Sequence, residues 1–353
     1  MTVLDNRALN RALLARQMLD RRHTRTASGT IEHLCGLQAQ EPHEPYYGLW
    51  SRLDGFEPAE LVELLETRKV VRTLLMRRTI HLVTADDCVQ LRGLHQPMLE
   101  ARMRAVYRRE LEGVDLGELA AAGLPIFAAQ PSILAEAGRA VGKRWPEVAP
   151  RALGDMLSSL VPLVQVTPRG VWGQKAPARN TTIEAWLGRP HEPAGNADEL
   201  VLRYLRAFGP AASADIRAWS GLSGLRESLN RLRPQLRTFR DVRGRELFDV
   251  LDGDLGESGP ENAPPRFLPA FDNVVLGFDD RSRIIDDAHR GLSVEGTRFV
   301  LVGGRVAGRW RPTEKDVQVT LFGPDGAEAV EHEGDRLRAW HGLEGRTVVE
   351  IRR

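Results

Sequence analysis

The sequence has little that would tie the chain to a disulfide framework, a metal or a membrane. Only two cysteines, Cys35 and Cys88, occur among 353 residues, and they form no C-x-x-C pair, which argues against a disulfide scaffold and a zinc site. No apolar run approaches the roughly 20 residues that a membrane-spanning helix needs. The first residues include Asp5, Arg7 and Arg11 rather than the apolar core of a secretory signal. We therefore expect a cytoplasmic protein with no metal, no other cofactor and no membrane partner.

The chain also lacks an excess of charge of one sign. Its 49 basic residues face 48 acidic ones, for a net charge of +1, which argues against a uniformly basic protein that coats nucleic acid. Lysine is scarce, so nearly all the basic residues are arginines. Arginine's planar fork suits phosphates and base edges, but a GC-rich genome produces the same bias. Composition alone leaves both explanations open.

What the sequence does contain is a recurring order of elements. The length suits about two to four modules, and the order helix, helix, hairpin recurs three times, which is typical of winged helices. The expected elements are helices at 6–21, 30–37 and 58–68 with a hairpin at 71–83 and a helical insertion at 85–111, then helices at 131–141 and 149–160 with a hairpin at 161–172, then helices at 198–207, 213–220 and 223–233 with a hairpin at 236–250.

Two segments rich in proline and glycine, 188–195 and 257–265, mark expected linkers. After the second, strands are expected at 298–310, around the Gly303-Gly304 turn, and at 347–351. The predicted fold is mainly α with β-hairpin wings (α+β): three tandem winged-helix units plus a C-terminal β-rich region. The expected domains are 1–125 (with the helical insertion), 126–190, 196–256 and 264–353.

Two glutamines separated by one alanine, Gln38 and Gln40, form the most informative short motif. Side chains two positions apart lie on one side of an extended chain but on nearly opposite sides of a helix. Pro42 moves Glu41 away from helical geometry and Pro45 repeats the signal, so both amides can face one point. Amides can hold a water molecule but are weak bases. The same residues are also typical of a helix end or turn, and their spacing leaves both interpretations open.

Four separated blocks carry a resemblance. They are residues 36–40 (Gly-Leu-Gln-Ala-Gln), residues 76–83 (Met-Arg-Arg-Thr-Ile-His-Leu-Val), residues 206–211 (Arg-Ala-Phe-Gly-Pro-Ala) with Ala214 and Asp215, and residues 266–273 continuing to 280–283. In this order they resemble the AlkZ/YcaQ family of bacterial winged-helix DNA glycosylases, nearly end to end. The Gln-apolar-Gln form of the motif resembles the AlkZ branch, whereas Gln-apolar-Asp belongs to the YcaQ branch.

The resemblance implies a monofunctional DNA glycosylase in which Gln38 and Gln40 are the catalytic pair. The implied reaction is hydrolysis of the N-glycosidic bond of bulky N7-alkylguanine adducts, and of interstrand crosslinks, in repair of or self-resistance to DNA-alkylating antibiotics. The implied partner is double-stranded DNA containing alkylated purines, bound by a monomer in a concave channel between the winged-helix units. Arg78 stands where many relatives carry glycine in the wing.

Phosphate contacts are expected to supply most of the affinity for DNA. The candidates are basic residues on the first wing, after residue 271 and on the C-terminal hairpin: Arg77, Arg78, His81, Arg281, Arg283, His289, Arg290, Arg298, Arg305 and Arg309. Each could instead be a surface or core residue paired within the protein.

Two other functions compete with the enzyme. A winged-helix transcriptional regulator would read sequence through the expected helix at 223–233, which carries Arg226, Asn230, Arg231 and Arg233. A damage sensor would bind the same lesions without cutting them. Composition and periodicity alone do not separate these functions from a glycosylase.

Overall fold

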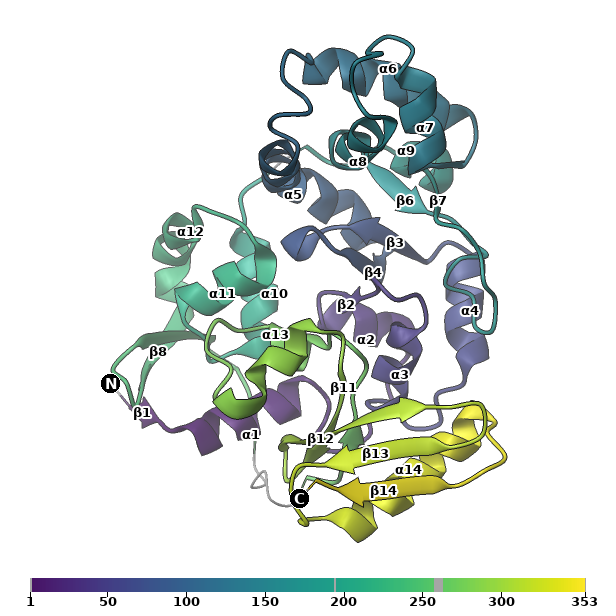
Figure 1. Cartoon of the computed structure of the whole chain (residues 1–353). Helices are drawn as coiled ribbons and strands as arrows, with labels where there is room; N and C mark the ends of the chain where they lie inside the picture. The colour runs from purple at the N-terminus through teal and green to yellow at the C-terminus, as the bar shows by residue number, and fades with distance from the viewer. Residues whose placement is uncertain (1, 194, 257–262, 353) are drawn as a thin grey trace. The chain divides into compact units, whose positions relative to one another are not determined.

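The computed structural model describes residues 2–193, 195–256 and 263–352, and Figure 1 shows its elements. The chain divides into two compact units: Met1–Glu57, Asp198–Trp219 and Gly224–Arg353 in the first, and Pro58–Ala197 with Ser220–Ser223 in the second. The first unit thus joins segments that are far apart in the sequence. The four predicted domains were based on the repeated order of helices and hairpins, whereas the two units are defined by their compactness. The four-domain division stays a prediction.

The first unit holds two sheets and most of the helices. Its helices are α1 (Asn6–Arg16), α2 (Ala27–His33), α3 (Glu44–Trp50), α10 (Asp198–Phe208), most of α11 (Ser213–Ser220), α12 (Leu225–Leu232), α13 (Asn273–Leu276) and α14 (Ala327–His341). Its strands are β1 (Val3–Leu4), β2 (Leu37–Gln38), β8 (Leu236–Asp241), β9 (Glu246–Val250), β10 (Arg266–Phe267), β11 (Arg298–Val302), β12 (Arg305–Pro312), β13 (Val317–Leu321) and β14 (Thr347–Ile351). Short 3-10 helices cover Arg233–Gln235 and Asp287–Val294.

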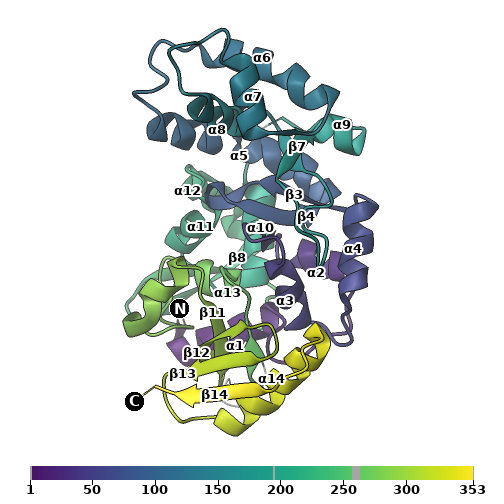
Figure 2. The same ribbon diagram turned by 45° about the vertical axis from the view of Figure 1, so that its right-hand side comes forward.

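The C-terminal region forms a five-stranded sheet of order β10-β11-β12-β13-β14. All neighbours are antiparallel except β13 and β14, which pair in parallel. A parallel pair needs a crossover connection, and α14 supplies it. Figure 2 shows α14 against β13 and β14, where buried Val330 and Leu337 of the helix lie over the sheet. The prediction of strands here is confirmed, but α14 was missed.

The second unit combines helices with a sheet. Its helices are α4 (Pro58–Glu66), α5 (Ala85–Val106), α6 (Leu116–Ala129), α7 (Leu134–Val141), α8 (Pro150–Leu160) and α9 (Ile183–Leu187), with a 3-10 turn at Met76–Arg78. Its strands are β3 (Val70–Leu74), β4 (Ile80–Thr84), β5 (Ser132–Ile133), β6 (Leu163–Gln165) and β7 (Arg179–Thr182), in the order β4-β3-β6-β7-β5.

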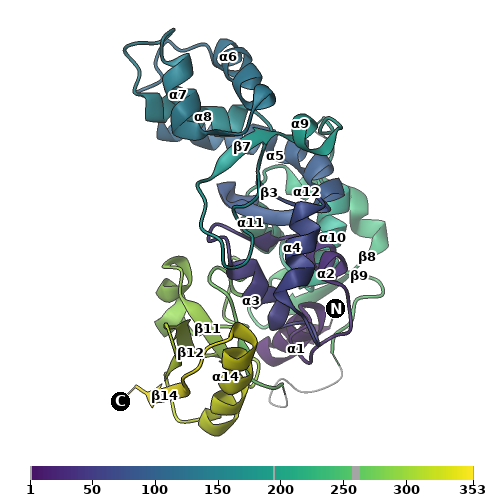
Figure 3. The same ribbon diagram turned by 90° about the vertical axis from the view of Figure 1, so that its right-hand side faces the viewer.

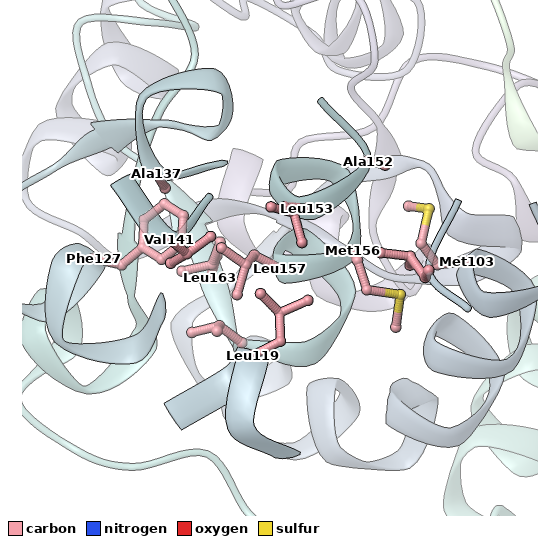
Figure 4. Close-up of a cluster of buried hydrophobic side chains, with 12 residues drawn as sticks. Met103, Leu119, Phe127, Ala137, Val141, Ala152, Leu153, Met156, Leu157 and Leu163 are labelled. Atoms are coloured by element: carbon pink, nitrogen blue, oxygen red, sulfur yellow. The ribbon is translucent and has the colours of Figure 1, made fainter. Parts of the chain in front are cut away.

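Helices α6, α7 and α8 gather at one end of this unit (Figure 3) around a core that includes Leu119, Phe127 and Leu157 (Figure 4). Two glycines allow α7 and α8 to approach closely. A Cβ atom at Gly138 would lie 2.0 Å from the carbonyl oxygen of Pro150, and one at Gly154 would lie 2.4 Å from that of Leu134. Any larger residue at either position would push the helices apart.

Much of the predicted element order is confirmed. The hairpins β3–β4 and β8–β9 lie within about two residues of their expected ranges, and α11 matches its range, 213–220. The predicted hairpin at 161–172 is wrong in its second strand. The turn at 168–170 exists, but residues 171–178 contain Gly173 and Pro177 and form no strand, so β6 pairs instead with β7.

Helix α6 was also missed, because Pro125 lies within it. The expected linkers lie partly outside the described residues, at residue 194 and residues 257–262. Among the described residues, no helix combines the length and apolarity that crossing a bilayer requires. The helix and hairpin order of residues 198–250 agrees with a winged helix, but the assignment of three tandem winged helices stays a prediction.

Candidate active site

Helix α2 ends in a tight turn directly before the glutamine motif. Cys35 has a φ of 56° and Gly36 a φ of 94°. The N–H of Gly36 donates to the carbonyl of Ile31 at 2.8 Å, and the N–H of Cys35 donates to that of Glu32 at 3.1 Å. This pair of bonds is a Schellman motif, which closes a helix and turns the chain away from its axis. The predicted extension of this helix to residue 37 is therefore wrong.

After the turn, strand β2 covers Leu37 and Gln38, a bend follows at Gln40, and burial alternates along these residues. Leu37 and Ala39 are buried, whereas Gln38 is half-buried and Gln40 is exposed. Alternate side chains of an extended segment point to the same side. The alternating burial thus places Gln38 and Gln40 outside the core, as the catalytic hypothesis requires, although their role stays a prediction.

A second segment, residues 270–273, runs beside the motif in the first unit. The Asn273 side-chain amide donates to the carbonyl of Gly36 at 3.3 Å, and the N–H of Ala270 donates to the carboxylate of Glu44 at 2.6 Å. These two hydrogen bonds join residues 36–44 to residues 270–273 at both ends. Gln38 and Gln40 lie between the two anchor points on one segment, and Phe271 lies between them on the other.

Buried Glu44 also fixes Arg298. The Nε of Arg298 donates to both Glu44 oxygens at 3.0 Å, and the guanidinium lies 5.3 Å from the ring centre of Tyr47. Burial opposes the charge on Arg298, but the hydrogen bonds to Glu44 and the charge of that carboxylate, with smaller contributions from Tyr47 and Glu41, together raise its pKa. Arg298 was predicted to contact phosphate, but its guanidinium instead pairs with the buried carboxylate of Glu44. Tyr47 packs rather than lines a cleft, because it is buried and its hydroxyl lies 2.9 Å from Nε2 of His341.

A second buried ion pair holds the segment after Phe271. Arg52 donates from both terminal nitrogens to the two oxygens of Asp272, each at 2.9 Å. Arg52 is fully buried and Asp272 is 7% exposed. Asp272 also accepts from the N–H of Val274 at 2.8 Å and so caps α13. A planar bidentate pair of this kind specifies orientation as well as charge, which fixes the backbone on the C-terminal side of Phe271.

The other predicted phosphate ligands of the first unit differ in accessibility. Arg283 is buried, 2% exposed, and its guanidinium donates to the carbonyl of Pro210 at 2.9 Å and lies over the Phe278 ring. Burial lowers the pKa of Arg283, with the carboxylate of Asp215 opposing that shift. Arg283 is therefore a structural residue, and its prediction as a phosphate contact was wrong.

The remaining candidates of the first unit keep some exposure. Arg290 is exposed, whereas Arg281, His289 and Arg305 are half-buried. Arg281 donates to the Ser293 hydroxyl at 2.6 Å, the His289 ring stacks on Phe322, and Arg305 donates to the carbonyl of Ser282 at 2.9 Å. These contacts hold the side chains of Arg281, His289 and Arg305 in place, but each side chain stays partly exposed.

A hollow of about 640 Å³ opens on the C-terminal sheet. It is lined by residues of β11 to β14 and the loop before β11, among them Gly296, Arg298, Arg309 and Arg311. Arg309 is exposed, while Arg311 donates to the Gln318 side chain at 2.9 Å. Arg309 therefore remains available to an anion.

In the second unit, Arg77 and Arg78 lie in the turn between β3 and β4. Both have left-handed backbones, with φ of 53° and 61°, and both are half-buried. Glycine adopts such a conformation at no steric cost, which accounts for the glycine that many relatives carry at the position of Arg78.

His81 on β4 was predicted to contact DNA, and the structure corrects this. It is fully buried, and its Nδ1 lies 3.0 Å from the carbonyl oxygen of Thr79. Burial lowers the pKa of His81 to about 3, so the ring is neutral. Nearby His95 is also fully buried, with a pKa lowered to about 4 by burial. His81 is thus a core histidine rather than a phosphate ligand.

These two histidines make stability sensitive to acid. A histidine whose pKa is lowered by folding stabilises the protein above its unfolded pKa of 6.5, and this contribution is lost as the pH falls toward the folded pKa. We expect the free energy of unfolding to fall between pH 6.5 and pH 4 by about 1.4 kcal/mol per pH unit for each histidine. Urea denaturation across this range measures the slope. His81→Leu should remove part of it and exposed His332→Gln should not; an unchanged slope in His81→Leu would contradict the assignment.

Part of the polar surface that a regulator would use for base readout is paired within the protein. Arg231 on α12 donates to both oxygens of Asp198, at 3.0 and 2.7 Å, and Arg233 pairs with Glu246 at 2.6 Å. Arg226 and Asn230 remain exposed. Two of the four polar residues that favoured readout thus have partners inside the protein.

The comparisons with known proteins agree with the blocks found in the sequence. Residues 31–340 match the family described as DNA glycosylase AlkZ-like. The chain belongs to the AlkZ-like DNA glycosylase family. Membership of the AlkZ-like DNA glycosylase family makes the chain a hydrolase that acts on N-glycosyl bonds and argues against the regulator.

A curated relative and a solved structure, both from Streptomyces sahachiroi, are similar to this member of the AlkZ-like family. One, described as an interstrand DNA cross-link repair glycosylase, is 25% identical over 340 residues, which cover 88% of this chain and 89% of the relative. The other is a solved structure of the DNA glycosylase AlkZ, with a TM-score of 0.82 and 22% identity over 99% of this chain and 100% of that chain. At this identity the structural similarity supports the fold alone.

Proposed function

We propose that this glycosylase removes bulky N7-alkylguanine adducts, including interstrand crosslinks, from double-stranded DNA. Two findings support this substrate class: the relative named for crosslink repair, and the Gln-apolar-Gln motif at Gln38 and Gln40. We further propose that the enzyme acts as a cytoplasmic monomer, in repair of or self-resistance to DNA-alkylating antibiotics.

The proposed chemistry suits uncharged catalytic side chains. Most glycosidases need a carboxylic acid to protonate the leaving group and a carboxylate to direct the attack. Alkylation at guanine N7 makes the base cationic, so its departure needs no acid. Water attacks the anomeric carbon, the bond to N9 breaks, and the bonding electrons neutralise the imidazolium ring of the base while the proton of the water passes to solvent.

Gln38 and Gln40 would supply orientation and electrostatic stabilisation. Their amide oxygens can hold the attacking water near the anomeric carbon and direct dipoles at the developing positive charge. The observation that supports this proposal is that the motif is not helical and that both glutamines lie outside the core, next to buried Leu37 and Ala39. A helical motif would have separated them.

A crosslinked base is tied to the opposite strand and cannot swing into an enclosed pocket, as base flipping requires. We therefore propose that the lesion is approached in an open, concave channel without full extrusion. Arg298 pairs with the buried carboxylate of Glu44 and is left out. The proposed phosphate contacts are the other candidates that keep some exposure: Arg77, Arg78, Arg281, His289, Arg290, Arg305 and Arg309.

Single-turnover incubation with a duplex that carries one bulky N7-alkylguanine tests the function. Release of the modified base, leaving an abasic site in the duplex, is the expected result. Binding without release would instead favour a damage sensor.

A further inference from the structure

Phe271 has a backbone conformation that bulky residues rarely adopt. Its φ is 60°, in the left-handed region where a side chain is strained. Such strain persists only where the surrounding structure enforces it, and it is found most often at functional sites. The enforcement here comes from both sides, through the Ala270 hydrogen bond to Glu44 and the Asp272 ion pair with Arg52.

The Phe271 ring is not buried with its neighbours. Ala270, Asp272 and Asn273 are all buried, but Phe271 is only half-buried. The ring lies against Gly296, where an added Cβ atom would be 3.1 Å from its Cζ. Gly296 in turn lines the hollow that contains Arg309. An aromatic ring that served packing alone would be expected in the core, at no cost in backbone strain.

Phe271 lies on a segment that is hydrogen-bonded to the segment of the glutamine motif. The hydrogen bonds from Asn273 to Gly36 and from Ala270 to Glu44 bracket Phe271 on one segment, and they bracket Gln38 and Gln40 on the other. All of these residues belong to the first unit. The half-buried Phe271 thus lies on a segment that two hydrogen bonds tie to the segment of the motif, which is the basis for the inference that follows.

We propose that Phe271 is a specificity-determining residue that contacts the alkylated purine. Its ring offers a flat apolar surface to the purine and to its N7 substituent, and the contact area grows with the size of that substituent. This inference rests on the proposed function, because it assumes an alkylated purine at Gln38 and Gln40. It adds a source of preference for bulky adducts, which the two small amides do not provide.

The test compares Phe271→Ala with Phe271→Gly on two duplexes, one with a bulky N7-alkylguanine and one with 7-methylguanine. Both variants lack the ring, but only glycine relieves the left-handed strain. We expect kcat/KM for the bulky substrate to fall about tenfold in both variants, as when a stacked aromatic side chain is truncated, and to fall less for 7-methylguanine. Thermal unfolding should show Phe271→Gly to be the more stable of the two.

Four outcomes would overturn the inference. Unchanged excision in both variants would show that the ring does not contact the substrate. An equal loss on both substrates, or a loss that follows thermal stability with Phe271→Ala the worse variant, would assign Phe271 a structural role. If the wild-type enzyme releases neither purine, the proposed function fails, and this inference fails with it. The wild-type measurement thus separates the two failures.

Discussion

Alanine in place of Gln38 or Gln40 is expected to lower the single-turnover rate of base excision by about 10²–10³-fold, the loss typical when one preorganised polar group is removed from an active site. Both side chains lie outside the core, so neither substitution should alter the fold or the affinity for undamaged duplex DNA. The measurement is the rate of base release at saturating enzyme, with DNA affinity measured in parallel. Exposed Gln130→Ala is the matched control and should retain the wild-type rate.

The double variant adds a sharper criterion. If Gln38 and Gln40 hold one water molecule together, removing either disables the pair, and their effects are not additive. Excision by Gln38→Ala/Gln40→Ala should then be little slower than excision by the slower single variant. Wild-type rates in both single variants would show that the catalytic groups lie elsewhere.

Asp272→Ala is expected to be the most destabilising substitution near the site. It leaves the Arg52 charge fully buried without its carboxylate partner, and breaking such a pair from one side costs about 3–5 kcal/mol. It also removes the cap of α13. Urea denaturation measures the change in the free energy of unfolding.

A surface ion pair of the same unit provides the control. Glu199 and Arg206 pair at 3.5 Å with side chains 68% and 52% exposed, and Glu199→Ala should cost about 0–1 kcal/mol. If Asp272→Ala were no more destabilising than Glu199→Ala, the ion pair could not be what fixes the backbone beside Phe271.

Sequence patterns that span only a few residues predicted two of the β-hairpins correctly. The alternation of residues 71–83 and the turn at Gly303-Gly304 each predicted a hairpin that the structure contains. Burial was harder to predict. An alternating strand is expected to have one buried side and one exposed side, but all three central residues of β4 are buried. The prediction that His81 lies at the surface was wrong for that reason.

The sequence did not reveal the contacts that hold the candidate site together. Glu44 pairs with Arg298, 254 positions away, and Asn273 reaches Gly36 across 237 positions. No local propensity encodes such distances. Pro45 indicated a break in helical structure from the sequence alone, yet it lies in the first turn of α3, where proline is favoured. The resemblance had marked residues 266–273 as a block without indicating what they contact.

The central claim is that a base already made cationic by alkylation can be removed by two uncharged amides. Its most direct test is the single-turnover rate of base release from two duplexes that differ only at one position, one carrying an N7-alkylguanine and the other the neutral purine hypoxanthine. The account predicts release of the N7-alkylguanine and none of the hypoxanthine above the uncatalysed background. Release of both at similar rates would show that the enzyme supplies an acid to the leaving group, which contradicts the roles assigned to Gln38 and Gln40.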